Sequence, residues 1–278
     1  MGDVRYMLVD KSAGAQRTGL APAAVTTRPQ APGEQQMTEA REGRRGVSVL
    51  RRAARAEWGP LLRTGWSALA ARKLRAIPVT LTAVCLTLVL QTVQNQPWGY
   101  RPVQDIGSVQ AYEHLWVALL RTPLSLFVPA LDLPVWGALV QILVVFGLAE
   151  ICVGWRQMFA VAYLATLAGT MYARIGLWIG PESPIGLPDA DKYVVDTGPS
   201  AAVVGLAIFV SWRYRAWFTC ALVVASMVFE VVFIKNNLAG KEHIAAVLAV
   251  LVLCGAWELW RPGKPRDAQR VSGWGHPR

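Results

Sequence analysis

A serine and a histidine are the residues of this 278-residue chain that could do chemistry together. Ser200 stands in the stretch DTGPSAAVVGL, residues 196–206, at the threshold of an apolar run. His243 is the one histidine of three that falls inside an apolar run. An ionisable residue in a bilayer is costly, which makes His243 a functional candidate. Beside such a base Ser200 would be a nucleophile, whereas alone it would be a small residue for helix packing.

The composition is typical of a membrane protein. Hydrophobic residues make up 54% of the chain and charged residues 17%, which suits several membrane spans. The net charge of +10 comes from basic residues before, between and after the apolar runs, a positive-inside pattern that argues against a nucleic-acid-binding face. All four cysteines fall inside apolar runs without metal-ligand spacing. The sequence therefore implies no metal and no organic cofactor.

Four regions can be distinguished along the chain. Residues 1–40 are rich in Ala, Pro, Gly and Gln and predict a disordered cytoplasmic tail. Residues 41–76 predict a basic amphipathic juxtamembrane segment, in which residues 41–75 would bind anionic lipids of the inner leaflet. Residues 77–260 hold the membrane domain, and residues 261–278 form a polar cytoplasmic tail.

The membrane domain is predicted to be all-α and polytopic, with six transmembrane helices. Arginines lie in the short inner turns, and acidic residues dominate the outer loop at 180–197. This bias places both termini in the cytoplasm, and we expect a multi-pass membrane protein. The six apolar runs are about 77–94, 134–153, 157–179, 198–212, 216–234 and 239–258.

The fourth run is too short to cross a bilayer alone. About 15 residues at 1.5 Å each give roughly 22 Å, against a hydrocarbon core of about 30 Å. We expect a central helix, surrounded by protein, whose first turn holds Ser200 below the outer surface. His243 lies at a matching depth in the sixth run, so the two side chains could meet. Gly198 and Pro199 suit a helix start, which Asp196 or Thr197 could cap.

Several motifs carry a family resemblance. The sequence Gly198-Pro199-Ser200-Ala201 resembles the Gly-x-Ser-Gly/Ala that opens the short fourth helix of rhomboid intramembrane proteases, and Glu242-His243-Ile244-Ala245-Ala246 resembles their sixth-helix His-x-x-Gly. FGLAEICVGWRQ is similar to the end of the second rhomboid helix, and LLRTPLSLFVPALD to the first loop. The chain most resembles divergent rhomboid-like membrane proteins of actinobacteria. The resemblance implies a Ser200–His243 dyad without an acid, and transmembrane protein substrates cut near the outer surface.

The sequence also departs from this family. The second-helix His-x-x-x-Asn, which supplies oxyanion donors, aligns with Pro134 and Ala138, and neither has a side-chain donor. Gln141 and the Asn236–Asn237 pair are possible substitutes, while Ala246 replaces the final glycine of the sixth-helix motif. Losing one oxyanion donor typically costs on the order of 10²–10³ in rate.

Two rival functions can be weighed against proteolysis, and the departures favour the first. A catalytically inactive rhomboid-like protein would bind transmembrane helices without cutting them. A small transporter or channel is disfavoured, because the sequence shows neither paired intramembrane charges nor broken-helix repeats. Of the remaining intramembrane charges, Glu150 is expected to pair with Arg156, a structural role, and Arg174 is expected to snorkel to the interface.

Overall fold

The described part of the chain is helical. The computed structural model describes residues 32–130, 134–234 and 237–260, with side chains from residue 48 onward. It divides into one unit up to Val49 and a larger unit that begins at Leu50. Within the described residues the only β pairing is an isolated antiparallel bridge between Val109 and Asp196. The predicted all-α class is confirmed.

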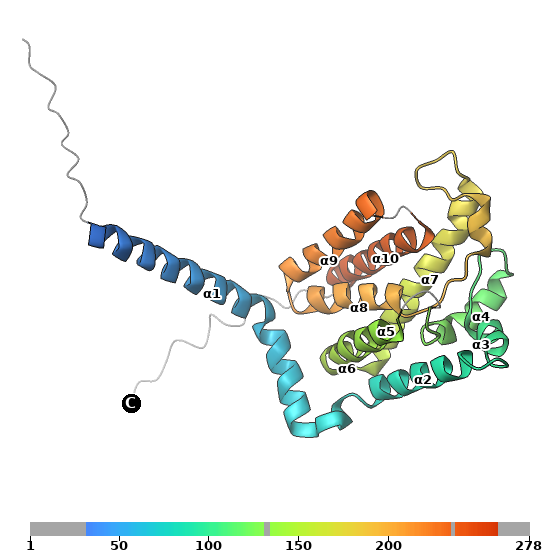
Figure 1. Cartoon of the computed structure of the whole chain (residues 1–278), viewed down its shortest axis with the longest axis horizontal. Helices are drawn as coiled ribbons and strands as arrows, with labels where there is room; N and C mark the ends of the chain where they lie inside the picture. The colour runs from blue at the N-terminus through green and yellow to red at the C-terminus, as the bar shows by residue number, and fades with distance from the viewer. Residues whose placement is uncertain (1–31, 131–133, 235–236, 261–278) are drawn as a thin grey trace, which may run out of the picture. The chain divides into compact units, whose positions relative to one another are not determined.

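The helices follow the apolar runs closely, with three further helices outside the predicted spans (Figure 1). The bounds of the α-helices are α1 Pro32–Arg72, α2 Pro78–Gln94, α3 Tyr100–Gly107, α4 Leu115–Ser125, α5 Val135–Gln141, α6 Gly147–Val153, α7 Trp155–Ile179, α8 Ser200–Arg213, α9 Trp217–Phe229 and α10 Leu238–Trp260. Short helical turns complete the set: η1 Lys73–Ala76, the π-helical η2 Ile142–Phe146, η3 Asp189–Tyr193 and the π-helical η4 Glu230–Ile234.

Four helical segments are long and apolar enough to cross a membrane. They are Val135–Val153, Trp155–Ile179, Trp217–Ile234 and Leu238–Trp260. A fifth is possible if Ser48–Ala76 and Pro78–Gln94, which meet at a 54° bend, count as one broken span. The structure is therefore that of a multi-pass protein with four or five candidate spans. A further apolar helix, α8, has 14 residues and is shorter than these candidate spans.

Helix α1 begins earlier than the sequence predicted. It starts at Pro32, inside the region expected to be a disordered tail. Proline suits the first helical turn, and the Glu, Gln, Met and Ala residues that follow are good helix formers. Residues 1–31 and the predicted polar tail at 261–278 lie outside the described residues.

The segment after Leu50 contacts the start of α9. Glu57 accepts hydrogen bonds from the backbone N–H and the hydroxyl of Thr219, with its Oε1 at 2.8 and 3.1 Å. The Trp58 indole donates to the same hydroxyl at 2.9 Å. Thr219 is in the first turn of α9, where backbone donors have no helical partner. A side chain from α1 therefore caps α9.

Glu150 has a structural role, but not the one predicted. Its Oε1 accepts from the Val79 N–H at 3.0 Å, and its Oε2 accepts from the N–H and hydroxyl of Thr80 at 2.8 and 2.7 Å. The expected pair with Arg156 is wrong, since that guanidinium lies over the Trp155 ring instead. The free N–H groups at the start of α2 attract a buried carboxylate more strongly than a cation outside the helix end does.

Helix α8 lies at the centre of the bundle, between α7, α9 and α10 (Figure 1). Eight of its 14 residues are buried. Close approach depends on Gly205: a Cβ at this position would lie 2.5 Å from the Ala165 Cβ of α7 and 3.1 Å from the Val250 Cγ2 of α10. Three helices meet there because none places a large side chain between the others.

The packing at Gly205 gives the first prediction. Gly205→Val should destabilise the folded protein by about 2 kcal/mol or more, because the added atoms must displace both neighbouring helices. Thermal unfolding in detergent, followed by tryptophan fluorescence, measures the change. Gly255→Ala in α10 is the matched control, since a Cβ there meets nothing within 4 Å. Equal melting temperatures for the two variants would contradict the role given to Gly205.

Candidate functional site

The structure brings the predicted serine and histidine into contact. Ser200 is the first residue of α8, and His243 lies in the second turn of α10. The distance from His243 Nε2 to Ser200 Oγ is 2.9 Å, a hydrogen bond in the range required of a nucleophile and its base. Ser200 is exposed and His243 is partly buried. The hydroxyl is thus open to a reactant, while the imidazole is held by the protein.

The second ring nitrogen of His243 has no partner among the described residues. Nδ1 is buried and makes no hydrogen bond there. When Nε2 accepts the serine proton, Nδ1 must carry the ring hydrogen. No carboxylate therefore orients the ring as in a three-residue triad. The structure thus shows a serine–histidine contact, and its role as a catalytic dyad stays a prediction.

The start of α8 differs from the prediction in one respect. Its N-cap is Pro199, and no side-chain cap is present at this described helix end. The cap predicted at Asp196 or Thr197 is wrong, because the chain turns at Gly198, whose φ is +107°. The Asp196 backbone is instead paired with Val109, by N–H···O bonds of 2.8 and 3.1 Å.

Gly198 holds this turn in place. A φ of +107° is readily available only to glycine, and the Gly198 N–H donates to the Ser125 carbonyl of α4 at 2.9 Å. Inside α8 the first backbone bond runs from Val203 N–H to the Pro199 carbonyl at 2.8 Å. The N–H groups of residues 200–202 therefore have no helical acceptor. They are candidate donors for an oxyanion that forms at Ser200.

The two predicted side-chain donors are not joined to the serine. Gln141 is exposed at the end of α5. Asn237 accepts from the Gly240 N–H through Oδ1 at 3.0 Å and so caps α10. Neither side chain makes a hydrogen bond to Ser200 within the described chain, so their roles at the site stay predictions. Asn236 lies outside the described residues.

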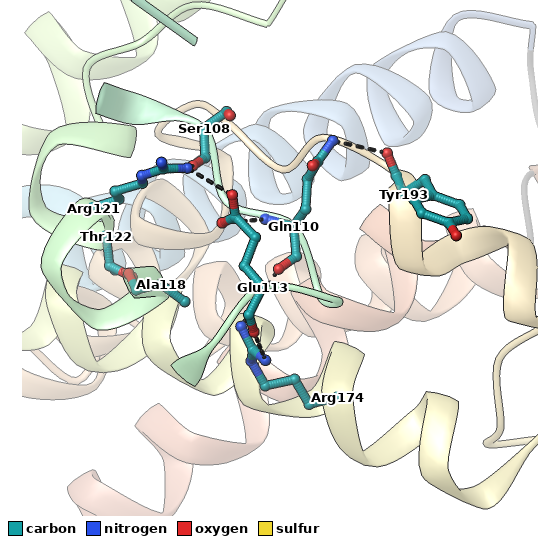
Figure 2. Close-up of polar contacts among 8 residues, drawn as sticks. All are labelled: Ser108, Gln110, Glu113, Ala118, Arg121, Thr122, Arg174 and Tyr193. Carbon is teal, nitrogen blue, oxygen red and sulfur yellow. Dashed lines mark hydrogen bonds and ion pairs between the residues drawn. The ribbon is translucent and has the colours of Figure 1, made fainter. Parts of the chain in front are cut away.

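A polar network that the sequence did not reveal fixes the loops next to the site (Figure 2). Arg174 of α7 donates to the carbonyls of Glu113 at 2.6 Å, Ala111 at 3.0 Å and Gln110 at 3.4 Å. The Glu113 carboxylate pairs with Arg121 at 2.7 Å. The predicted snorkelling role of Arg174 is therefore incomplete, since its guanidinium organises the loop at 110–113.

The same network reaches the chain before α8. The Gln110 side chain donates to the Tyr193 carbonyl at 3.0 Å (Figure 2), and the Val109–Asp196 bridge lies next to it. The loop after α3 is thereby joined to the segment that leads into Ser200. An Arg and a Glu near an interface give no sequence signal of such contacts, because their partners are mostly backbone carbonyls.

Comparison of the chain with protein-family models, curated proteins and solved structures finds no match. Within the described residues, no group of three or more His, Cys, Asp or Glu side chains could hold a metal ion. The function must therefore be argued from the residues and their geometry.

The turn at Gly198 gives the second prediction. Gly198→Ala should cost about 1 kcal/mol or more of stability, because an L side chain is strained at this φ although the nearest atom is 4.0 Å away. It should also shift Ser200 relative to His243. Thermal unfolding measures the first effect, and the rate at which a serine-reactive probe labels the protein measures the second. Gly137→Ala, at a position in α5 where an added Cβ meets nothing within 4 Å, should not lower the stability and should leave the labelling rate unchanged.

Proposed function

We propose that this protein is a rhomboid-like intramembrane serine protease that hydrolyses a peptide bond in or near a transmembrane segment. The observation that carries the proposal is the 2.9 Å contact between Ser200 Oγ and His243 Nε2. It joins an exposed hydroxyl at a helix start to a partly buried imidazole, which is the arrangement that nucleophilic catalysis requires. The motif order at Ser200 and His243 and the short helix α8 support the rhomboid assignment.

The chemistry follows from the positions of these groups. His243 Nε2 takes the proton of Ser200 as the hydroxyl oxygen attacks the scissile carbonyl. His243 returns that proton to the leaving amine, and an acyl-enzyme ester remains on Ser200. Water, deprotonated by the same nitrogen, then releases the carboxylic acid product and restores the serine. The free N–H groups of residues 200–202 would stabilise the oxyanion in both steps.

The position of Ser200 within the bundle limits where the cleaved bond of a substrate could lie. Ser200, the first residue of α8, contacts His243 in the second turn of α10, so α10 extends about one turn beyond the start of α8. On the proposed topology the reacting bond would therefore lie close to the outer boundary of the hydrocarbon region. The proposed clients are transmembrane proteins of a bacterial plasma membrane, with both termini of the protease in the cytoplasm. The positive-inside distribution of basic residues supports this orientation.

The juxtamembrane segment supports a lipid contact. Leu50, Leu62 and Trp66 are more than half exposed, and the exposed Arg51 and Arg55 lie near them. Apolar side chains beside arginines favour the headgroup region of an anionic leaflet. We therefore propose that this segment lies on the inner membrane surface.

A second candidate function is a rhomboid-like protein that binds transmembrane helices without cutting them. Its support is the absence of side-chain donors at Pro134, the N-cap of α5, and Ala138 within that helix. Without such donors the reaction depends on backbone N–H groups alone, at a cost on the order of 10²–10³ in rate.

Labelling with a fluorophosphonate tests the protease. The folded full-length protein in detergent should form a covalent serine adduct. Ser200→Ala should abolish it, and His243→Ala should slow it by roughly 10²-fold or more, because the general base is lost. Ser226→Ala is the matched control, since that exposed serine donates to the Val223 carbonyl of its own helix.

The outcomes separate the two functions. Labelling that depends on Ser200 and His243, together with cleavage of a reconstituted transmembrane substrate, supports the protease. A folded protein that remains unlabelled but co-purifies with transmembrane helices supports the binder. Labelling that persists in Ser200→Ala would refute the assignment of the nucleophile.

A further inference from the structure

Two carboxyl groups beside the dyad face one small cavity. Asp196 and Glu242 line a cavity of about 10 Å³, together with Thr170 and apolar side chains. Asp196 lies four residues before Ser200 in the chain, and Glu242 immediately precedes His243. The cavity therefore lies between the segment that leads into α8 and the first turns of α10. No role in the proposed hydrolysis uses either carboxyl.

Glu242 is deeply buried and incompletely bonded. Glu242 is only 5% exposed, and its Oε1 has no hydrogen-bond partner among the described residues. Gly169 of α7 makes room for it, since a Cβ there would lie 3.2 Å from the Glu242 Cβ. A buried carboxylate without a partner is costly, and a second carboxylate facing it increases that cost.

The charged groups around the cavity do not neutralise the pair. The acidic groups close enough to Glu242 to interact with it electrostatically are Asp196, Asp191 in η3 and Tyr172 of α7. Of the nearby cations, Lys241 Nζ donates to the Gly186 carbonyl at 2.8 Å. Arg174 donates to loop carbonyls through its two terminal nitrogens, whereas its buried Nε has no partner among the described residues. Neither carboxyl forms an ion pair within the described residues. Asp196 as a whole residue is half-buried, and the burial of its carboxyl group raises its pKa to about 6.

We infer that Asp196 and Glu242 bind one proton between them and act, in that state, as positioning residues for Ser200 and His243. The shared proton would form an O–H···O⁻ bond, which joins the segment before α8 to α10. Loss of that proton leaves two carboxylates that repel each other across the cavity and move the two segments apart. The positioning effect rests on the proposed function, whereas the proton site does not.

The first test measures stability against pH for the full-length protein in detergent. A group whose pKa is raised on folding stabilises the folded state at low pH and loses that contribution as pH rises through its folded value. The melting temperature of the wild type should therefore fall by roughly 5 °C between about pH 5 and about pH 8. Asp196→Asn and Glu242→Gln should flatten this slope, because one amide supplies a permanent donor to the remaining carboxylate.

Glu182→Gln is the matched control, as an exposed acid of the same outer loop, and it should keep the wild-type slope. A flat wild-type profile, or an unchanged slope in both amide variants, would overturn the proton site. Stabilisation of the wild type by Na⁺ at constant ionic strength, lost in Glu242→Gln, would also overturn it and assign the cavity to a metal cation.

The second test measures positioning. The ratio of fluorophosphonate labelling rates, Glu242→Gln over wild type, should be near one at about pH 5 and rise severalfold at about pH 8. A ratio that stays constant with pH would show a structural role alone and refute the positioning. If no variant labels at all, the proposed protease fails, while the melting profiles still decide the proton site.

Discussion

A helix of 14 residues cannot cross a bilayer, and much of this structure follows from that constraint. At 1.5 Å per residue α8 spans about 21 Å, against a hydrocarbon core of about 30 Å. A lipid-facing helix of this length would leave backbone or polar groups in hydrocarbon. Burial among α7, α9 and α10 removes that problem. The first residue of the helix, Ser200, nevertheless remains exposed at one end of the bundle.

The central position of α8 constrains both the side chains of the helices that pack against it and the hydrogen bonds of the loops next to it. α7 and α10 can approach it only where side chains are small, as at Gly205 and Ala165. The loops next to it must satisfy the backbone groups that they bury. The Arg174 guanidinium donates hydrogen bonds to three of the loop carbonyls. Further along the chain, the backbone groups of Val109 and Asp196 pair with each other. The turn at Gly198 is thus fixed by its own hydrogen bond to Ser125 and by the pairing of Asp196, two residues earlier, with Val109.

Sequence periodicity and hydropathy predicted the long helices well. The six apolar runs agree with helix ends to within about two residues, and the short fourth run corresponds to α8. Depth matching along α8 and α10 also predicted that Ser200 and His243 could meet, because helical rise fixes depth. The helices α3 and α4 were not predicted, since they are short and lie in a segment without a continuous apolar run.

Side-chain partners were harder to predict, for a physical reason. Glu150 could pair with a nearby arginine or with the free N–H groups of a helix 70 residues away, and only the fold decides which is closer. The same holds for Asp196, whose position before a helix favours a cap, although the positive φ of Gly198 prevents it. Hydrogen bonds to backbone carbonyls, such as those of Arg174, leave no pattern in the sequence at all.

The surroundings of the Ser200–His243 pair also bear on its geometry. His243 has no acid behind its Nδ1 within the described chain, so its orientation must come from packing in α10. Glu242, the preceding residue, faces α7 rather than α8, because successive residues on a helix point about 100° apart. One turn of α10 thus presents an imidazole to Ser200 and a carboxyl to the loop that leads into Ser200. Any force on that carboxyl acts on the backbone that carries the imidazole, and this links the charge state of the cavity to the geometry of the dyad.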